Sequence, residues 1–148
     1  MDILQRFMAY AQDFEKTLVD DDWTRLKPYF AADAVYEVQA PGFGCKLEGP
    51  QAIFKGMKKS LDGFDRRFTG RDIDVTSGPE ITGDEIKLGW TVTYNKEGLT
   101  PFVLRGRSAA RYRGAEIVRL TDSYDPSVAG EFSAWKQSNQ IEVDASYT

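Results

Sequence analysis

The side chains that can do chemistry in this sequence are mainly carboxylates and phenols, because it contains no histidine and a single cysteine, Cys45. This composition excludes Ser-His-Asp triads, Cys-His pairs, histidine-ligated metal sites and intrachain disulfides. Cys45 follows a glycine and has no histidine to activate it, so we expect no nucleophilic role. Proton transfer by this chain would therefore use Asp, Glu, Tyr or Lys.

Asp122 is the strongest candidate, because it is the one carboxylate on the apolar face of an alternating segment. In the expected strand over 116–125, that face carries Val118, Leu120, Asp122 and Tyr124. An unpaired carboxylate is expensive to bury, so its presence there needs a reason. Desolvation raises the pKa of a carboxyl group in an apolar pocket, which suits a general acid or base near neutral pH.

Alternatives compete with a chemical role for Asp122. It can be a structural carboxylate that pairs with Arg105 or Arg107, or that accepts backbone hydrogen bonds. A one-residue slip in the hairpin at 113–116 would also exchange the two faces of the strand. Asp125 is the weaker candidate, since it precedes a proline and is better explained as the cap of a last helix.

Aromatic side chains, which make up 13% of the sequence, can complete a pocket around this carboxylate. Such residues can stack on a flat ligand, although they more often form plain core. A hydroxyl of Tyr36 or Tyr124 can also donate a hydrogen bond to an oxyanion. The residues that we expect to contact a substrate are Tyr36, Trp90, Leu104, Ser108, Leu120 and Tyr124.

The elements that must position these residues are helices followed by strands. Helical spacing predicts an amphipathic helix over 2–20 capped by Asp2, a short helix that contains Pro28, and a third helix that begins at Gly49-Pro50. Alternation predicts a strand over 33–39 and four long strands over 66–76, 84–96, 100–113 and 116–125, with one of the turns at Ser77-Gly78-Pro79. A last helix is expected over 126–138. Segregated helices and strands favour an α+β fold with helices on one face of a curved sheet.

The other face of the expected sheet is basic. It would carry Arg105, Arg107, Arg111, Arg113 and Arg119. We expect these arginines to be solvated, or to face a second copy of the chain, and to pair with acids such as Glu37, Asp72 or Asp74. Uncharged residues mix with them, namely Thr91, Thr93, Ala109 and Ile117. A mixed face of this kind favours a homodimer with a two-fold interface.

Three stretches resemble the SnoaL-like branch of the nuclear transport factor 2-like superfamily. They are Asp22-Trp23 with Lys27-Pro28-Tyr29-Phe30-Ala31-Ala32-Asp33-Ala34-Val35-Tyr36, Leu47-Glu48-Gly49-Pro50-Gln51-Ala52-Ile53, and Ile117-Val118-Arg119-Leu120-Thr121-Asp122-Ser123-Tyr124-Asp125. Their order and spacing match over nearly the whole chain. The resemblance implies a cone-shaped curved antiparallel sheet packed against N-terminal helices, a cystatin-like roll, with a pocket between sheet and helices. It also implies a single SnoaL-like domain over 1–138 and a polar C-terminal tail over 139–148.

The resemblance further implies that Asp122 matches the acid/base carboxylate of the family's polyketide cyclases. Scytalone dehydratase-like chemistry uses histidines, which are absent here. The Arg and second Asp of limonene epoxide hydrolase have no match, since the nearest positions are Trp90 and Val92. We therefore expect a small hydrophobic ligand, no cofactor and no metal. The protein would be a cofactor-independent isomerase, cyclase or dehydratase, or alternatively a non-catalytic ligand-binding or dimerisation module.

The formal charge of −4 argues against nucleic acid as a partner, because phosphate binding needs a basic face. No apolar run approaches the ~20 residues of a membrane helix. The N-terminal segment carries charge at Asp2 and Arg6, where a signal peptide would be apolar. We expect a cytoplasmic protein that does not bind membranes.

Overall fold

The structure is a computed structural model that describes residues 2–42 and 44–148. Its helices are α1 (Ile3–Asp20), α2 (Pro50–Gly63) and α3 (Val128–Asn139), with 3-10 helices η1 (Trp23–Tyr29) and η2 (Asp65–Arg67). Its strands are β1 (Phe30–Gln39), β2 (Cys45–Glu48), β3 (Gly70–Thr82), β4 (Glu85–Asn95), β5 (Phe102–Arg113) and β6 (Glu116–Tyr124). The α+β class expected from the sequence is confirmed.

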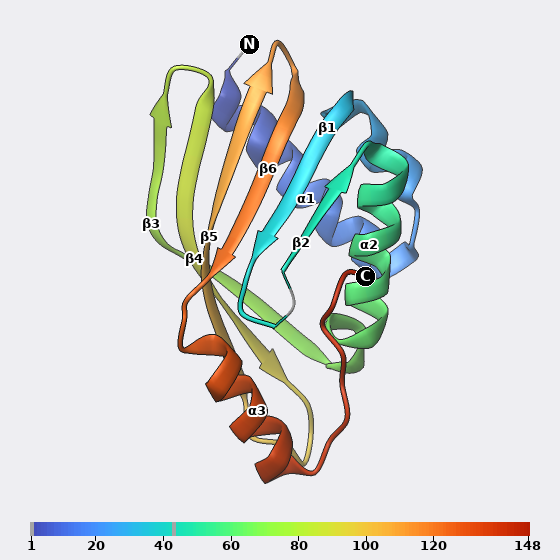
Figure 1. The fold of residues 1–148 in the computed structure, drawn as a ribbon, viewed down its shortest axis with the longest axis vertical. Helices are drawn as coiled ribbons and strands as arrows, with labels where there is room; N and C mark the ends of the chain where they lie inside the picture. The colour runs from blue at the N-terminus through green and yellow to red at the C-terminus, as the bar shows by residue number, and fades with distance from the viewer. Residues whose placement is uncertain (1, 43) are drawn as a thin grey trace.

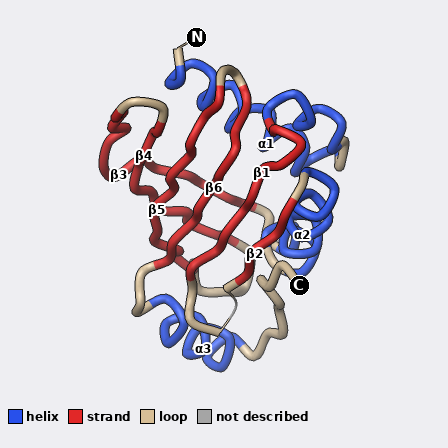
Figure 2. Tube along the Cα trace, turned by 45° about the horizontal axis from the view of Figure 1, so that its top comes forward, coloured by secondary structure: helices blue, strands red, loops and turns tan. Residues whose placement is uncertain are grey.

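The strands form one curved, open sheet in the order β2-β1-β6-β5-β4-β3 (Figures 1 and 2). All neighbours are antiparallel except β1 and β6, which are parallel, so the sheet is mixed rather than wholly antiparallel. Figure 1 shows α1 behind the sheet, α2 beside β2, and α3 at the narrow lower end. This arrangement leaves one face of the sheet covered by helices and the other open.

The helices α1 and α2 begin where the sequence predicts, whereas α3 begins at Val128, two residues later than expected. The carboxylate of Asp2 accepts the backbone N–H of Leu4 at 2.9 Å, and so caps α1. Pro50 occupies the first turn of α2, and Ile53, Met57 and Leu61 are its buried apolar residues. No helix in the described part of the chain is long and apolar enough to cross a membrane.

The edge strands differ most from the sequence prediction. β2 was not predicted, since it has only four residues. β3 begins at Gly70 and continues through Ser77-Gly78-Pro79 to Thr82, so the predicted turn there is wrong. β3 is the last strand of the sheet, and a proline is tolerated on an edge because one side of the strand makes no ladder. The turn lies at residues 83–84, where Gly83 has a φ of 61°.

The β5–β6 hairpin sets the faces of the two central strands. Arg113 pairs with Glu116 across a two-residue turn, in which Gly114 has a φ of 62°. The register then shifts beside Arg111, as a β-bulge does. Ile117 therefore points into the core and is fully buried, so its predicted place on the outer face is wrong.

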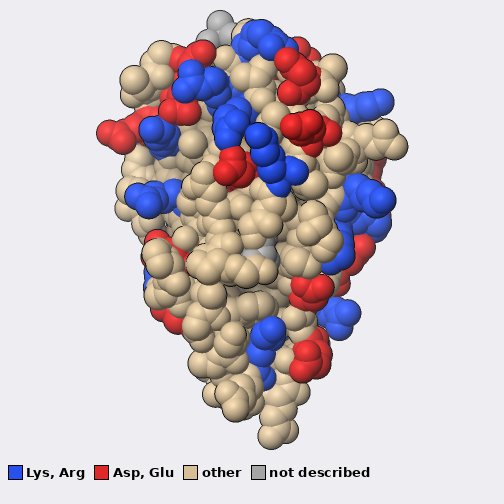
Figure 3. All heavy atoms as spheres, viewed as in Figure 1, with Lys and Arg blue, Asp and Glu red and all other residues tan. Residues whose placement is uncertain are grey.

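The outer face carries ion pairs, as expected. Arg119 pairs with Glu37, and Arg113 pairs with Asp33 at 2.6 Å. Figure 3 shows basic and acidic side chains interspersed over the upper part of this face and a mainly uncharged middle. Asp72 and Asp74 form no ion pair with any residue that the structure describes, so Glu37 is the one predicted acid that does.

Asp125 is not the cap of α3, contrary to the prediction. The residue at the helix start is Ser127, and no side chain caps it. The carboxylate of Asp125 instead lies 3.3 Å from Nε of Arg105 on the neighbouring strand. The attraction of that guanidinium competes with the helix terminus for the same oxygens.

Candidate functional site

A cavity of about 400 Å³ lies between the sheet and the three helices. Its size and its mainly apolar, aromatic wall are those of a small-molecule site. The residues that the sequence analysis proposed for a site all line it: Tyr36, Trp90, Leu104, Ser108, Leu120, Asp122 and Tyr124. They come from β1, β4, β5 and β6, whose inward faces the alternation assigned correctly at these positions.

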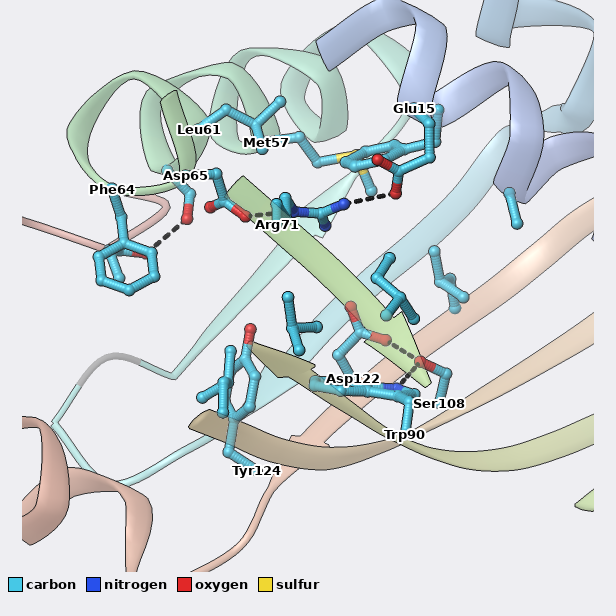
Figure 4. Close-up of a pocket in the computed structure, with 18 of the residues that line it drawn as sticks. Glu15, Met57, Leu61, Phe64, Asp65, Arg71, Trp90, Ser108, Asp122 and Tyr124 are labelled. Carbon is cyan, nitrogen blue, oxygen red and sulfur yellow. Dashed lines mark hydrogen bonds and ion pairs between the residues drawn. The ribbon is translucent and has the colours of Figure 1, made fainter. Parts of the chain in front are cut away.

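Asp122 is half-buried in the wall of the cavity, and its carboxylate is held by one hydroxyl donor on each oxygen. Ser108 Oγ donates to Oδ1 at 2.6 Å, and the Tyr36 hydroxyl donates to Oδ2 at 2.6 Å. The indole Nε1 of Trp90 donates to Ser108 Oγ at 2.8 Å and so directs the serine proton toward Asp122 (Figure 4). The pairing of β5 with β6 explains the hydrogen bond between Ser108 and Asp122, since these two residues are opposite each other in the ladder.

The environment of Asp122 raises the proton affinity of its carboxyl group. Burial raises the pKa of its carboxyl, and the hydrogen bonds from Ser108 and Tyr36 only partly oppose this shift. Among the described residues, no lysine or arginine forms an ion pair with Asp122. Arg105, one of the two arginines proposed as a structural partner, instead pairs with Asp125 and Glu131.

Two of the aromatic residues also belong to the packed core. Tyr36 and Tyr94 are each 2% exposed and lie in the two hydrophobic clusters. Trp90 and Tyr124 pack edge to face, with ring centroids 5.8 Å apart. The aromatic wall therefore combines core packing with a surface that faces the cavity.

A second polar group lines the cavity, and the sequence analysis missed it. Arg71 of β3 donates from Nε to Asp65 at 2.9 Å and also pairs with Glu15 of α1. The Tyr94 hydroxyl donates to the same oxygen of Asp65 at 2.8 Å. Figure 4 shows this group on the opposite side of the cavity from Asp122 and Trp90.

Little in the sequence indicated that Glu15, Asp65 and Arg71 would meet. Glu15 lies within the predicted amphipathic helix, but three elements far apart in sequence must meet before it joins Arg71 and Asp65. Tyr147, from the segment after α3, also lines the cavity and was not predicted.

Among the residues described, no group of three or more His, Cys, Asp or Glu side chains is placed to hold a metal ion.

The arrangement can bind a mainly apolar molecule and exchange a proton with it at Asp122. A carboxyl group whose proton affinity is raised by burial serves as an acid or a base near neutral pH. The surrounding tyrosine and serine hydroxyls are donors that stay protonated under the same conditions. The mainly apolar wall lowers the polarity of the space around the carboxyl, which strengthens these polar contacts.

Comparisons with known proteins identify the fold. No protein-family model matches the chain, and no curated protein matches it significantly. TerC, co-crystallised with polyporic acid, is 16% identical, with 91% of this chain and 98% of that one covered and a TM-score of 0.66. A candidate SnoaL-like polyketide cyclase from Shewanella denitrificans OS-217 is 16% identical, with 92% and 97% covered and a TM-score of 0.65.

A third solved structure extends the comparison. A hypothetical protein from Catenulispora acidiphila DSM 44928 with a ketosteroid isomerase-like fold, in complex with trimethylamine, is 22% identical. The alignment covers 86% of this chain and 88% of that one, with a TM-score of 0.58. The chain thus has the ketosteroid isomerase-like, SnoaL-like fold that the sequence resemblance implied, and at these identities the likeness concerns the fold.

Proposed function

We propose that this protein binds a small, mainly apolar carbonyl compound in the cavity and that Asp122 transfers a proton on it without a cofactor. One observation carries the proposal. The carboxyl of Asp122 faces the cavity with a raised pKa, and the described residues supply hydroxyl donors but no cationic partner to neutralise it. A structural carboxylate at this depth would be expected to have such a partner.

The proposed step is an enolisation. The Asp122 carboxylate takes a proton from the carbon next to the carbonyl group of the bound molecule. The electron pair of that C–H bond forms a C=C bond, and the carbonyl oxygen becomes an enolate oxygen. The enolate oxygen then re-forms the carbonyl group while the electron pair of the C=C bond takes the proton back from the Asp122 carboxyl. Protonation on the opposite face of the same carbon gives an epimer, and protonation at the γ-carbon of a conjugated enone gives a double-bond isomer, so no other reactant is consumed.

Two comparisons support the proposed ligand class. TerC has this fold and was crystallised with polyporic acid, and the Shewanella protein is a candidate polyketide cyclase. A non-catalytic binding module is the second candidate. It is favoured by the observation that Ser108 and Tyr36 already satisfy both oxygens of Asp122 without a ligand.

Deuterium exchange into α-tetralone, an apolar two-ring ketone, separates the two candidates. Thermal-shift assays with cyclic ketones, hydroxyquinones and lactones first establish binding, since ligand at 100 times its Kd stabilises a fold by roughly 2.7 kcal/mol. The protein in D2O should then exchange the α-protons of bound α-tetralone faster than buffer does, as followed by proton NMR. Asp122→Asn should bind α-tetralone and lose the exchange.

Asp125→Asn is the matched control, because Asp125 is a carboxylate outside the cavity. It should exchange α-tetralone at the wild-type rate. Binding without exchange by the wild-type protein would instead favour the non-catalytic module. If no member of the panel binds, the proposed ligand class is wrong.

A further inference from the structure

The segment that follows α3 turns back and runs along α2, as Figures 1 and 2 both show. The backbone N–H of Asp144 donates to the carbonyl oxygen of Gly63 at 3.1 Å. Ser60 Oγ donates to the carbonyl oxygen of Ala145 at 2.6 Å. Val143 is 8% exposed and belongs to the hydrophobic cluster around Phe64. These contacts fix the segment to α2 by both backbone and core packing.

Two glycines of α2 make room for this segment. A Cβ at Gly63 would lie 2.0 Å from the carbonyl oxygen of Asp144, and a Cβ at Gly56 would lie 3.0 Å from the carbonyl oxygen of Tyr147. Residues seven positions apart lie on the same face of a helix. Helix interiors disfavour glycine, so Gly56 inside α2, together with Gly63 at its end, indicates that the close approach of the segment is a built feature of the fold.

The segment ends by placing Tyr147 in the wall of the cavity. Its ring packs against that of Tyr36, with centroids 5.7 Å apart. Its hydroxyl lies 3.1 Å from the hydroxyl of Tyr124. The proton of the Tyr36 hydroxyl is used by Asp122, so it is not available to a ligand.

The Tyr124 and Tyr147 hydroxyls form one hydrogen bond, and both phenols have raised pKa values. Burial, and next the charge of Asp122, raise the pKa of Tyr147 to about 12, while hydrogen bonds with Tyr124 and Tyr36 act in the opposite direction. Burial first, and the bond with Tyr147 as well, raise the pKa of Tyr124 well above its ordinary value. Both phenols therefore keep their protons at neutral pH. Either hydroxyl can donate in their mutual bond, and when Tyr124 donates, the proton of Tyr147 can point to an acceptor in the cavity.

We infer that the segment Ile141–Tyr147 is part of the binding site and that the Tyr147 hydroxyl donates a hydrogen bond to an oxygen of the bound molecule. The inference rests on the proposed function for the place of the ligand, but not on proton transfer by Asp122. The bound molecule must then carry an oxygen that accepts a hydrogen bond, such as the carbonyl oxygen of a cyclic ketone or quinone. In this arrangement the Tyr124 hydroxyl, 3.1 Å away, donates to that of Tyr147 and strengthens its donation to the ligand, since hydrogen bonds in a chain polarise one another.

Tyr147→Phe tests this inference, because it keeps the ring against Tyr36 and removes only the hydroxyl. The probes are α-tetralone and tetralin, which have the same two rings with and without the carbonyl oxygen. Tyr147→Phe should bind α-tetralone about three- to tenfold more weakly than wild type does and bind tetralin equally well. The infrared carbonyl stretch of bound α-tetralone should rise toward its value in an apolar solvent.

Two further variants make the outcome specific. Tyr29→Phe removes a phenol that donates to Asp13 and does not line the cavity, so it should bind both probes as wild type does. Asp122→Asn should keep the low carbonyl frequency whether or not it loses deuterium exchange, which separates this inference from the proposed function. Unchanged affinity and frequency in Tyr147→Phe would overturn the inference. So would an equal loss of tetralin binding, since Tyr147 would then be packing alone.

Discussion

Ser108 and Asp122 stand opposite each other on β5 and β6, and the serine hydroxyl donates to the carboxylate at 2.6 Å. Trp90 fixes the direction of that donation, because its indole N–H already occupies a lone pair of Ser108 Oγ at 2.8 Å. The small side chain at 108 therefore orients the carboxyl group at the centre of the cavity. It also accounts for the burial of the indole nitrogen, which would otherwise lack an acceptor.

Ser108→Ala should destabilise the protein and raise the pKa of Asp122 further. The substitution removes a donor to the charged carboxylate and leaves the Trp90 N–H without its acceptor, at a cost of about 1–3 kcal/mol in the free energy of unfolding. Chemical denaturation measures this cost. Ser123→Ala is the control, since Ser123 donates to Gln39 on the exposed face, and it should change stability by less than about 0.5 kcal/mol. Equal effects of the two variants would contradict the role given to Ser108.

Asp122→Asn should leave the melting temperature at pH 7 unchanged or raised. The folded protein holds Asp122 with a raised pKa, so its ionisation at neutral pH costs folding free energy that the neutral Asn does not. This cost is absent below the pKa of the unfolded chain, near ~3.9, and grows as pH rises through the folded-state pKa. The difference between variant and wild type should therefore increase from pH 4 to pH 8.

Asp65→Asn, at another carboxylate of this cavity, should destabilise the protein, in contrast to Asp122→Asn. The side chain of Asp65 is 10% exposed and accepts from Arg71 and Tyr94, so this variant loses a charge that Arg71 needs. It should lower the free energy of unfolding at pH 7 by about 1–3 kcal/mol. A clear drop in the melting temperature of Asp122→Asn, comparable to that of Asp65→Asn, would make Asp122 a structural residue.

Gly63→Ala should destabilise the protein, although alanine is the better helix former. A Cβ at this position would meet the carbonyl oxygen of Asp144 at 2.0 Å and push the C-terminal segment away. Gly130→Ala in α3 is the matched control, because a Cβ there meets nothing within 4 Å. It should stabilise by about 0.5–1 kcal/mol. Thermal melts of both variants decide the point, and stabilisation by Gly63→Ala would contradict the packing described.

The parts of the site that could be predicted from the sequence are those fixed by the alternation of residues within a single strand. Alternation along single strands placed Trp90, Ser108 and Asp122 on one face correctly, because the period of two is a property of the backbone. The same pattern failed at Ile117, because a β-bulge beside Arg111 moves one residue to the other face without any change in composition.

Contacts between distant segments were beyond the sequence. The Arg71 group unites α1, η2 and β3, and the position of Tyr147 depends on a segment that has no periodic pattern. Gly56 and Gly63 did mark the path of that segment, but a glycine in a helix does not say which chain passes over it. The edge strand β3 was mistaken at Pro79 because proline usually ends a strand, and only the sheet order shows that this one lies at an edge.

A homodimer through the open face of the sheet remains a prediction. Val103 of β5 is 39% exposed on that face, where Arg113 and Arg119 already pair with acids of the same chain. Light scattering at micromolar concentration should give twice the mass of one chain, and Val103→Lys should shift the protein toward the monomer. A mass near that of one chain for the wild-type protein would refute the prediction.

The most direct test of the central claim is the titration of Asp122 itself. Carbon-13 NMR of protein labelled at aspartate carboxyl carbons, with the resonance assigned from its loss in Asp122→Asn, follows that one group through pH. We predict a midpoint above the ~3.9 of a free aspartate, because burial penalises the charged form and no described residue pairs with it as a cation. A midpoint at or below that value would mean that Asp122 is held as a stabilised anion, and the proposed proton transfer would lose its residue.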